Sequence, residues 1–508
     1  MNEHIDCVLG LDIGTTSTIG ILIELPDRVL AKASRPMTLS SPKVGWAEEN
    51  PEDWWANVTE IVPELLERSG VPADAIKAIG ITGMLPALVT LDQDDTVIRP
   101  AIQQSDGRCG AQVAEIASEI DEAEFTQIAG NGINQQLIAA KLRWLEQNEP
   151  DNFKRIATVF GSYDFINWKL TGKKAIEQNW ALEAGFVDLG THQLSDELIA
   201  LGHVSRACIP DKTRSEEILG HVTHSAMQAT GLRVGTPVVG GAADHIASGL
   251  AAGVTQPGDI LLKFGGSIDV LIATEKASPD PRMFLDYHLI PGLFMPNGCM
   301  ASGGSSLNWF AEKFAGGEAD TARQAGITLH QHLDRIATTT PPGADGVQII
   351  PYFLGEKTPL HDTDARGIIH GLSLNHDLRH VWRAMLEGYA YALRHHVEVF
   401  EEMGHPSRRF LASDGGANSL LWMQICANVL QQPVQLLKGH PGSCLAAAWV
   451  AAIGVGLSDD WAGISRYVTY GELIQPASQT AGLYDEGYRQ FRETYNAQRA
   501  IREAIREH

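Results

Sequence analysis

The chain has 508 residues, and its 39 lysines and arginines against 62 aspartates and glutamates give a net charge of −23. This length accommodates about two to four domains, and a hydrophobic content of 44% is that of a folded globular protein, which excludes wholesale disorder. The acidic charge argues against nucleic acid as a main partner, because neutralising phosphates requires a basic surface.

Cysteine usage and the absence of long apolar stretches indicate the compartment. The six cysteines show neither a Cys-x-x-Cys pair nor a zinc-type spacing, which is typical of a reducing cytoplasm. The first residues lack the basic and apolar regions of a signal peptide. The apolar stretch 442–457 is shorter than the ~20 residues that span a bilayer, and it predicts a buried helix. We expect a soluble, cytoplasmic protein without membrane contact.

The chain begins with a pattern that predicts a hairpin. Cys7–Leu11 is an apolar run typical of a buried strand, Asp12–Thr18 is a turn of small polar residues, and Ile19–Leu25 predicts the returning strand.

The same pattern recurs about 250 residues later. There the strand Asp259–Phe264 leads into Gly265, Gly266 and Ser267, and Ile268–Ala273 returns. Two such units indicate a duplicated architecture. A helix end followed by a turn near Gly253–Pro257 sets the boundary, so we predict domains at 1–253 and 254–508.

Helical and strand patterns alternate along the chain, which indicates an α/β fold. The predicted helices are 51–68, 137–147, 378–402 and 419–431, and the further predicted strands are 78–81, 237–239 and 409–412. The charged C-terminal segment 490–508 is predicted to be a solvated helix.

Three glycine-containing turns follow apolar strands, and the third is Asp414–Asn418. Glycine lets the backbone approach a phosphate closely, and exposed N–H groups and hydroxyls supply hydrogen-bond donors. The third turn also leads into a predicted helix, whose N-terminus favours an anion. The turns predict a nucleotide bound between two similar domains. No P-loop, dinucleotide-binding, zinc-protease or nucleophile-elbow motif occurs in the sequence.

Two aspartates have an ambiguous position. Asp244 follows the strand 237–239 and opens an Ala/Gly-rich helix, where it could stabilise the helix start or project into a cleft as the base that accepts a hydroxyl proton. Phosphoryl transfer to an alcohol needs such a base. Asp12 could stabilise its turn or serve as an outer ligand of Mg²⁺, which prefers oxygen ligands and often binds through water.

The sequence resembles the FGGY family of carbohydrate kinases from about residue 8 to residue 456. The resemblance rests on ordered motifs: Asp12-Ile-Gly-Thr-Thr-Ser17, Gly45-Trp-Ala-Glu48, Pro51-x-x-Trp54-Trp55, Arg99-Pro-Ala-Ile102, Asp106-Gly-Arg108, Leu170-Thr-Gly172, Gly240-Gly-Ala-Ala-Asp244, Gly355-Glu-Lys-Thr-Pro359, Arg366-Gly367, Gly371-Leu372, His376, Ala384-x-x-Glu387-Gly388 and Gly415-Gly-Ala-Asn418.

The resemblance implies two ribonuclease H-like domains of the actin-like ATPase superfamily, with a deep cleft that closes on ATP and a sugar. It implies that Asp244 is the catalytic base and that Asp12 is associated with Mg²⁺. The remaining implied contacts are Gly14, Thr15, Thr16, Gly265, Gly266 and Ser267 with phosphates, Gly415, Gly416 and Asn418 with adenosine, and Leu85, Gln104, Asp244 and His245 with the sugar. A homodimer is the usual assembly in the family.

The sequence departs from the family pattern at the first turn and at the sugar site. Ile19 stands where the family usually has a lysine or arginine, which weakens charge stabilisation of the transferred phosphoryl group. Met84-Leu85-Pro86 replaces the Gln-Met-His of xylulose kinases, and Gln104 replaces a usual tryptophan. The sugar site therefore gains an apolar edge.

Three functions follow as hypotheses. The first is ATP-dependent phosphorylation of a small sugar, foremost a ketopentose such as xylulose, with another ketose or a polyol as the alternative. The second is a sugar- or nucleotide-binding protein with weak activity, motivated by Ile19. The third is an actin- or chaperone-like ATPase with a protein partner.

Overall fold

The computed structural model describes residues 6–440 and 442–506. The chain divides into two compact units, and neither is one continuous segment. The first unit comprises Met1–Thr255, Glu275–Met295 and Pro441–Val468, and the second comprises Gln256–Thr274, Pro296–His440 and Thr469–His508. The chain therefore leaves and re-enters each unit.

The first unit is built on a mixed sheet with the strand order β13-β14-β5-β1-β2-β3, to which β15 adds by pairing with β5. β2 is antiparallel to β1 and β3, whereas β5 is parallel to β1 and β14. The strands are β1 (Cys7–Ile13), β2 (Ser17–Glu24), β3 (Arg28–Pro36), β5 (Ile76–Gly83), β13 (Ile218–His221), β14 (Pro237–Val239) and β15 (Ala242–Ala243).

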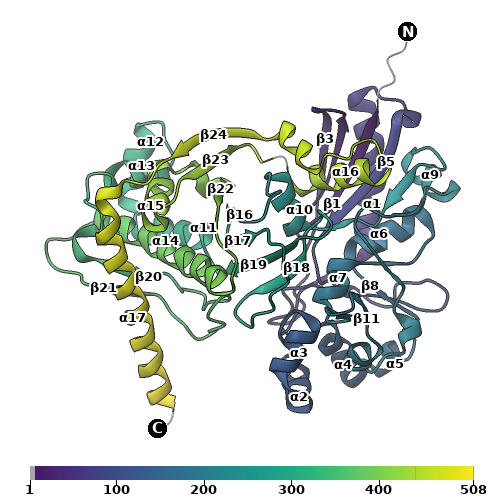
Figure 1. Cartoon of the computed structure of the whole chain (residues 1–508), viewed down its shortest axis with the longest axis horizontal. Helices are drawn as coiled ribbons and strands as arrows, with labels where there is room; N and C mark the ends of the chain where they lie inside the picture. The colour runs from purple at the N-terminus through teal and green to yellow at the C-terminus, as the bar shows by residue number, and fades with distance from the viewer. Residues whose placement is uncertain (1–5, 441, 507–508) are drawn as a thin grey trace. The chain divides into compact units, whose positions relative to one another are not determined.

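The helix α16 (Ser443–Gly454) packs on β1 and β5 with almost no space between backbones (Figure 1). Gly10 and Gly80 are partners in the register of these strands. A Cβ atom at Gly10 would lie 2.0 Å from the carbonyl oxygen of Cys444, and one at Gly80 would lie 1.9 Å from that of Ala447. Only glycine permits this close approach.

Other helices and short strands complete the first unit. The helices are α1 (Pro51–Ser69), α2 (Gly110–Glu119), α3 (Glu122–Ala129), α4 (Ile138–Asn148), α5 (Pro150–Phe153), α6 (Ser162–Thr171), α7 (Gln178–Glu183), α8 (Asp196–Ala200), α9 (His224–Thr230) and α10 (Asp244–Ala251). The short strands are β4 (Glu48–Glu49), β6 (Val89–Leu91), β7 (Ala101–Ile102), β8 (Thr158–Phe160), β9 (Ile176–Glu177), β10 (Val187–Asp188), β11 (Gln193–Leu194), β12 (Lys212–Thr213) and β18 (Phe284–Tyr287).

The second unit repeats the strand arrangement of the first. Its sheet runs β19-β17-β16-β22-β23-β24, with β17 antiparallel to β16 and β19, and with β22 parallel to β16 and β23. The order β3-β2-β1-β5-β14 of the first sheet matches β19-β17-β16-β22-β23 of the second, so the duplication predicted from the sequence is confirmed. The strands are β16 (Asp259–Phe264), β17 (Ile268–Ile272), β19 (Phe294–Met300), β22 (Arg409–Ser413), β23 (Val434–Lys438) and β24 (Thr469–Ile474).

Among the described residues, a small sheet and six helices cover the second unit, and the long α14 packs beside α15 (Figure 1). The sheet consists of β20 (Gln348–Ile350) and β21 (Ile368–His370). The helices are α11 (Gly304–Phe314), α12 (Ala319–Gln324), α13 (Leu329–Ala337), α14 (Leu378–Glu402), α15 (Leu420–Leu430) and α17 (Ala481–Arg506). Within the described residues, no helix combines the length and apolarity needed to cross a membrane.

The C-terminal helix predicted over 490–508 is confirmed, and most of its side chains within 490–505 are exposed, but one face of α17 is buried. Tyr484, Tyr488, Phe491 and Tyr495 of α17 are buried, and they pack with Tyr352 and Tyr391. Their spacing of three and four residues puts them on one helix face, which is the pattern of an amphipathic helix.

Candidate functional site

Three strand ends meet at one edge of the first sheet. Ile13 at the end of β1 and Ala243 at the end of β15 are both register partners of Gly83, at the end of β5. Each strand leads directly into a predicted site segment: β1 into the turn Gly14–Thr16, β5 into the segment with Leu85, and β15 into the start of α10. The first unit thus gathers the predicted phosphate turn, one predicted sugar contact and Asp244 at the same edge.

The predicted Mg²⁺-associated residue, Asp12, lies at the end of β1. The hydroxyl of Ser443, the first residue of α16, donates a hydrogen bond to its Oδ2 atom. The turn beside it is closed by a hydrogen bond of 3.1 Å from Gly14 N–H to the Ser17 carbonyl, and the Thr15 hydroxyl contacts the Met84 sulfur at 3.4 Å. A carboxylate beside a turn of small residues is suited to a hard cation that bridges phosphates.

The predicted base, Asp244, is the first residue of α10. Ala243 occupies the N-cap position and has no capping side chain, so Asp244 lies in the first turn, where the helix dipole favours a negative charge. Its side chain is 36% exposed. This exposure leaves the carboxylate accessible to a substrate, as the role of a base requires.

His245 is surrounded by three carboxyl groups. Its Nε2 atom lies 3.0 Å from Asp286 Oδ2 and 3.7 Å from Glu183 Oε1, and its Nδ1 atom lies 3.5 Å from Asp244 Oδ1. The side-chain atoms of Glu183, His245 and Asp286 that could bind a metal lie within 4.8 Å of one another, which is close enough for a metal ion. In this structure His245 and Asp286 instead pair with each other through a hydrogen bond.

Lys141 ties together the segments that carry Leu85 and Gln104. It is completely buried in α4, and its ammonium group donates hydrogen bonds of 3.0 Å to the carbonyl oxygens of Pro86 and Gln103. Burial lowers its pKa to about 8. The two predicted sugar contacts are therefore held around one ammonium group, which the sequence analysis did not single out.

Gln103 is a second residue that the sequence analysis missed. Its side chain is buried, and neither amide atom has a hydrogen-bond partner among the described residues; the same holds for Oε1 of Gln104. Buried amides of this kind normally bind a ligand or water. The sequence does contain a signal that could have revealed Gln103, namely two adjacent glutamines directly after an apolar strand.

In the second unit, two glycine turns also meet at one edge. Lys263 of β16 is the parallel register partner of Ser413 of β22, so the turns after these strands lie side by side. The N-terminus of α11 closes on the first turn, because Gly304 N–H donates a hydrogen bond of 3.0 Å to the Gly265 carbonyl. The second turn, Gly415–Asn418, leads into α15 as predicted.

These turns line a cavity of about 580 Å³. The predicted contacts Gly265, Gly266, Gly415, Gly416 and Asn418 line it, whereas Ser267 does not. Its volume lies within the range of roughly 300–1,000 Å³ that is usual for small-molecule sites. The structure thus brings together five of the six nucleotide-site residues predicted in the second unit.

Three further residues shape this cavity and were not predicted. The indole of Trp382 donates a hydrogen bond of 2.8 Å to Asp334, and the ring of His330 packs against Trp382 at 5.6 Å. Burial lowers the pKa of His330, so its ring is neutral near pH 7. The imidazole and the indole pack edge to face, and both give the cavity an aromatic wall against which a heterocycle can pack. No local motif marks this group, because His330 and Asp334 come from α13 and Trp382 comes from α14.

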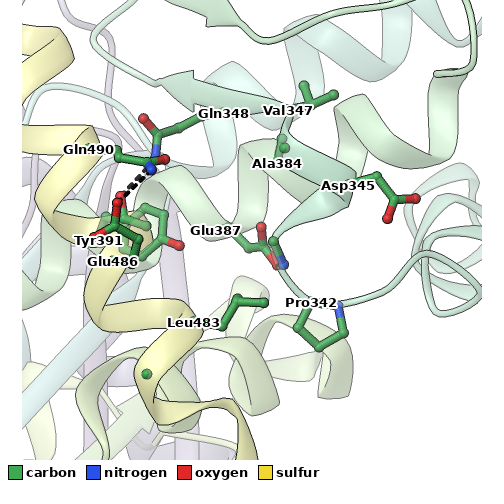
Figure 2. A pocket seen from close by; sticks show the side chains of 14 residues that line it. Pro342, Asp345, Val347, Gln348, Ala384, Glu387, Tyr391, Leu483, Glu486 and Gln490 are labelled. Carbon is green, nitrogen blue, oxygen red and sulfur yellow. Dashed lines mark hydrogen bonds between the residues drawn. The ribbon is translucent and has the colours of Figure 1, made fainter.

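A second cavity, of about 560 Å³, lies between α14 and α17 (Figure 2). None of the residues predicted to contact ATP, the sugar or Mg²⁺ lines this cavity. Glu387 accepts hydrogen bonds from Arg383, Tyr484 and Gly343, and the Gln348 amide donates one of 2.7 Å to the Gly487 carbonyl. Because Asp345, Glu387 and Glu486 line this cavity, a triphosphate would be repelled.

Comparison with known proteins shows what the whole chain is similar to. Residues 7–251 match the N-terminal domain and residues 262–455 the C-terminal domain of the FGGY family of carbohydrate kinases. A xylulose kinase from Bacillus subtilis (strain 168) is 27% identical over 98% of both chains, and a gluconokinase from the same organism is 27% identical over 94% of this chain and 93% of its own. A crystal structure of a xylulose kinase from Rhodospirillum rubrum is 52% identical, with a TM-score of 0.92 over 97% of this chain and 99% of that chain.

Proposed function

Because the chain belongs to the FGGY family of carbohydrate kinases, with the two-domain fold of actin-like ATPases, we propose that it transfers the terminal phosphoryl group of ATP to a hydroxyl of xylulose. The family implies ATP as the co-substrate, and xylulose is the substrate named for similar proteins from several bacteria. The observation that carries the proposal is the meeting of the first turn, Leu85 and Asp244 at one sheet edge.

The proposed reaction uses residues of both domains, 1–253 and 254–508. Asp244 accepts the proton of the sugar hydroxyl while the hydroxyl oxygen attacks the terminal phosphorus of ATP. The bond between this phosphorus and the bridging oxygen then breaks, and ADP departs with that oxygen. Two turns stabilise the charge of the phosphates through their backbone N–H groups and hydroxyls. The first turn contains Gly14, Thr15 and Thr16, and the second contains Gly265, Gly266 and Ser267. A Mg²⁺ ion associated with Asp12 would neutralise charge on the phosphates.

The adenosine is proposed to bind in the cavity of the second unit, against Gly415, Gly416 and Asn418. The sugar is proposed to bind near Leu85, Gln104, Asp244 and His245. Gln103 joins these residues because its buried amide can pair with sugar hydroxyls. The apolar Leu85 and Pro86 favour a ketose with few hydroxyls on that side, so a deoxyketose or another ketose is the alternative substrate.

The experiment is a measurement of ADP release with Mg·ATP against xylulose, other ketoses, deoxyketoses, gluconate and polyols, with a control that lacks sugar. We expect stimulation by a ketopentose. Asp244→Asn, which removes the base but keeps the shape of the side chain, should lower kcat by about 10²–10⁴-fold. Equal ADP release with and without every sugar would contradict the proposal and favour an ATPase or a binding protein. Unchanged kcat in Asp244→Asn would contradict the assignment of the base.

A further inference from the structure

We propose that His245 is a positioning residue, whose imidazolium is held by Asp286 and in turn fixes the orientation of Asp244. This inference rests on the proposed function, because it assigns a role relative to the proposed base. It begins with the geometry: Nε2 of His245 faces Asp286 and Nδ1 faces Asp244, at 3.0 Å and 3.5 Å. The ring thus lies between a buried and an accessible carboxylate.

Asp286 is suited to be the fixed end of this arrangement. It is completely buried in β18, between Leu285 and Tyr287. The amide of Asn131 both accepts from and donates to the backbone of Leu285, at 2.9 Å each, and the amide of Asn179 does the same with Tyr287, at 2.7 Å and 3.0 Å. Two asparagine clamps on either side of Asp286 fix its backbone, and hence the position from which it holds His245.

The surroundings of His245 favour its charged form. The titratable groups that face it are Asp244 on its own helix, Asp286 on β18 and Glu183 on α7. Burial and the N-terminus of α10 oppose a cation there. The interactions with Asp286 and Asp244 outweigh the effect of burial and raise the pKa of His245 well above its usual value.

Glu183 contributes differently from the other two carboxyl groups. Its burial, together with the neighbouring Asp286, raises its pKa well above the usual range, which favours its protonated form. Lys141 on α4 also interacts electrostatically with Glu183. The imidazole of His245 therefore lies among carboxyl groups that favour its protonated form.

This arrangement determines what His245 can do. An imidazolium has a hydrogen on both ring nitrogens, and each of these nitrogens faces a carboxylate, so His245 has no lone pair to accept the substrate proton. It can instead hold the Asp244 carboxylate in one orientation, because its Nδ1 atom faces Asp244 Oδ1 at 3.5 Å.

The first test is a pH titration of the histidine ring by NMR, with ¹⁵N-labelled histidine in the full chain. We expect the His245 signals of the wild type to report the cation at pH 8, and those of Asp286→Asn to report the neutral ring there. His192→Asn is the matched control, because His192 contacts the neighbouring Tyr287 hydroxyl at 2.9 Å. A His245 ring that is already neutral at pH 7 in the wild type would overturn the inference.

The second test is the measurement of kcat and KM in Asp286→Asn, which leaves the His245 side chain itself unchanged. Losing the hold on the ring should lower kcat about tenfold, because the base is no longer kept in the productive orientation, while KM for the sugar stays within about twofold. An unchanged kcat in a folded Asp286→Asn variant would refute the assignment. His245→Asn is the second variant, and it should lower kcat and also raise KM, because His245 is itself a predicted sugar contact.

The two proposals fail in different ways. If the wild type shows no sugar-dependent ADP release, the proposed function is wrong, and the NMR titration still determines the charge of His245. If ADP release depends on both the sugar and Asp244 but His245 titrates normally, only the positioning role is wrong.

Discussion

Neighbouring glycines in the third turn have opposite surroundings, although both line the cavity of the second unit. A Cβ atom at Gly416 would lie 2.7 Å from the Trp422 ring and 2.8 Å from Phe264 Cβ, so a side chain there would disturb the fold. A Cβ atom at Gly415 would meet nothing within 4 Å. Gly415 therefore permits a test of ligand binding that leaves the packing intact.

We expect Gly415→Ala to keep the thermal stability of the wild type and to raise the Kd for ATP about tenfold or more, which corresponds to about 1.4 kcal/mol. The physical reason is that the added methyl group occupies space in which the nucleotide is proposed to bind. Calorimetric titration with ATP measures the effect. Gly316→Ala is the control, because its Cβ also meets nothing within 4 Å but lies outside the cavity. Equal ATP affinity in both variants would place adenosine elsewhere.

At the scale of elements, the packing of α16 on the first sheet depends on two glycines. Gly10 and Gly80 lie next to each other on β1 and β5, and the helix backbone occupies the space where side chains would be. Backbone on both sides of this contact leaves little freedom to adjust, because protein interiors are closely packed. The same helix provides Ser443, which contacts Asp12.

Gly80→Ala should therefore destabilise the protein by about 1–3 kcal/mol, since its methyl group would collide with the Ala447 carbonyl. Urea unfolding followed by circular dichroism measures the change. Gly110→Ala is the matched control at the first residue of α2, where a Cβ meets nothing within 4 Å, and it should be neutral or slightly stabilising. A wild-type midpoint for Gly80→Ala would mean that α16 can move away from the sheet at little cost.

The sequence predicts those parts of the fold that depend on residues close to one another in the chain. The hairpins that became β1–β2 and β16–β17 are confirmed, because each depends on two apolar runs and one short turn. The C-terminal helix is confirmed, but its charged residues obscured the two buried aromatic residues Phe491 and Tyr495 on one face. The carboxylate cluster could not be predicted, because Asp286 is positioned through Asn131, whose partner Leu285 is 154 residues away.

At the scale of the whole molecule, the first unit consists of three chain segments, and residues 441–468 belong to it although they follow most of the second unit. The last of these segments contains α16, which covers the face of β1 and β5. A fragment that ends at residue 255 would expose this apolar face.

We expect the isolated fragment 1–255 to lack a cooperative thermal transition and to bind a hydrophobic dye, as compact states without fixed packing do. The control is a fusion that joins 1–255, 275–295 and 441–468 through flexible linkers, which restores every segment of the unit and should unfold cooperatively. Near-ultraviolet circular dichroism and differential scanning calorimetry distinguish the two. Cooperative unfolding of 1–255 alone would show that α16 is dispensable.

The late position of α16 in the chain has a consequence for biosynthesis. Residue 255 is translated about 210 residues before residue 468, which is roughly 10–40 s at 5–20 residues per second. During this interval the nascent β1 and β5 lack their covering helix, while the strands of the second unit are already emerging from the ribosome. The N-terminal half should therefore be held by chaperones until the last quarter of the chain has been synthesised.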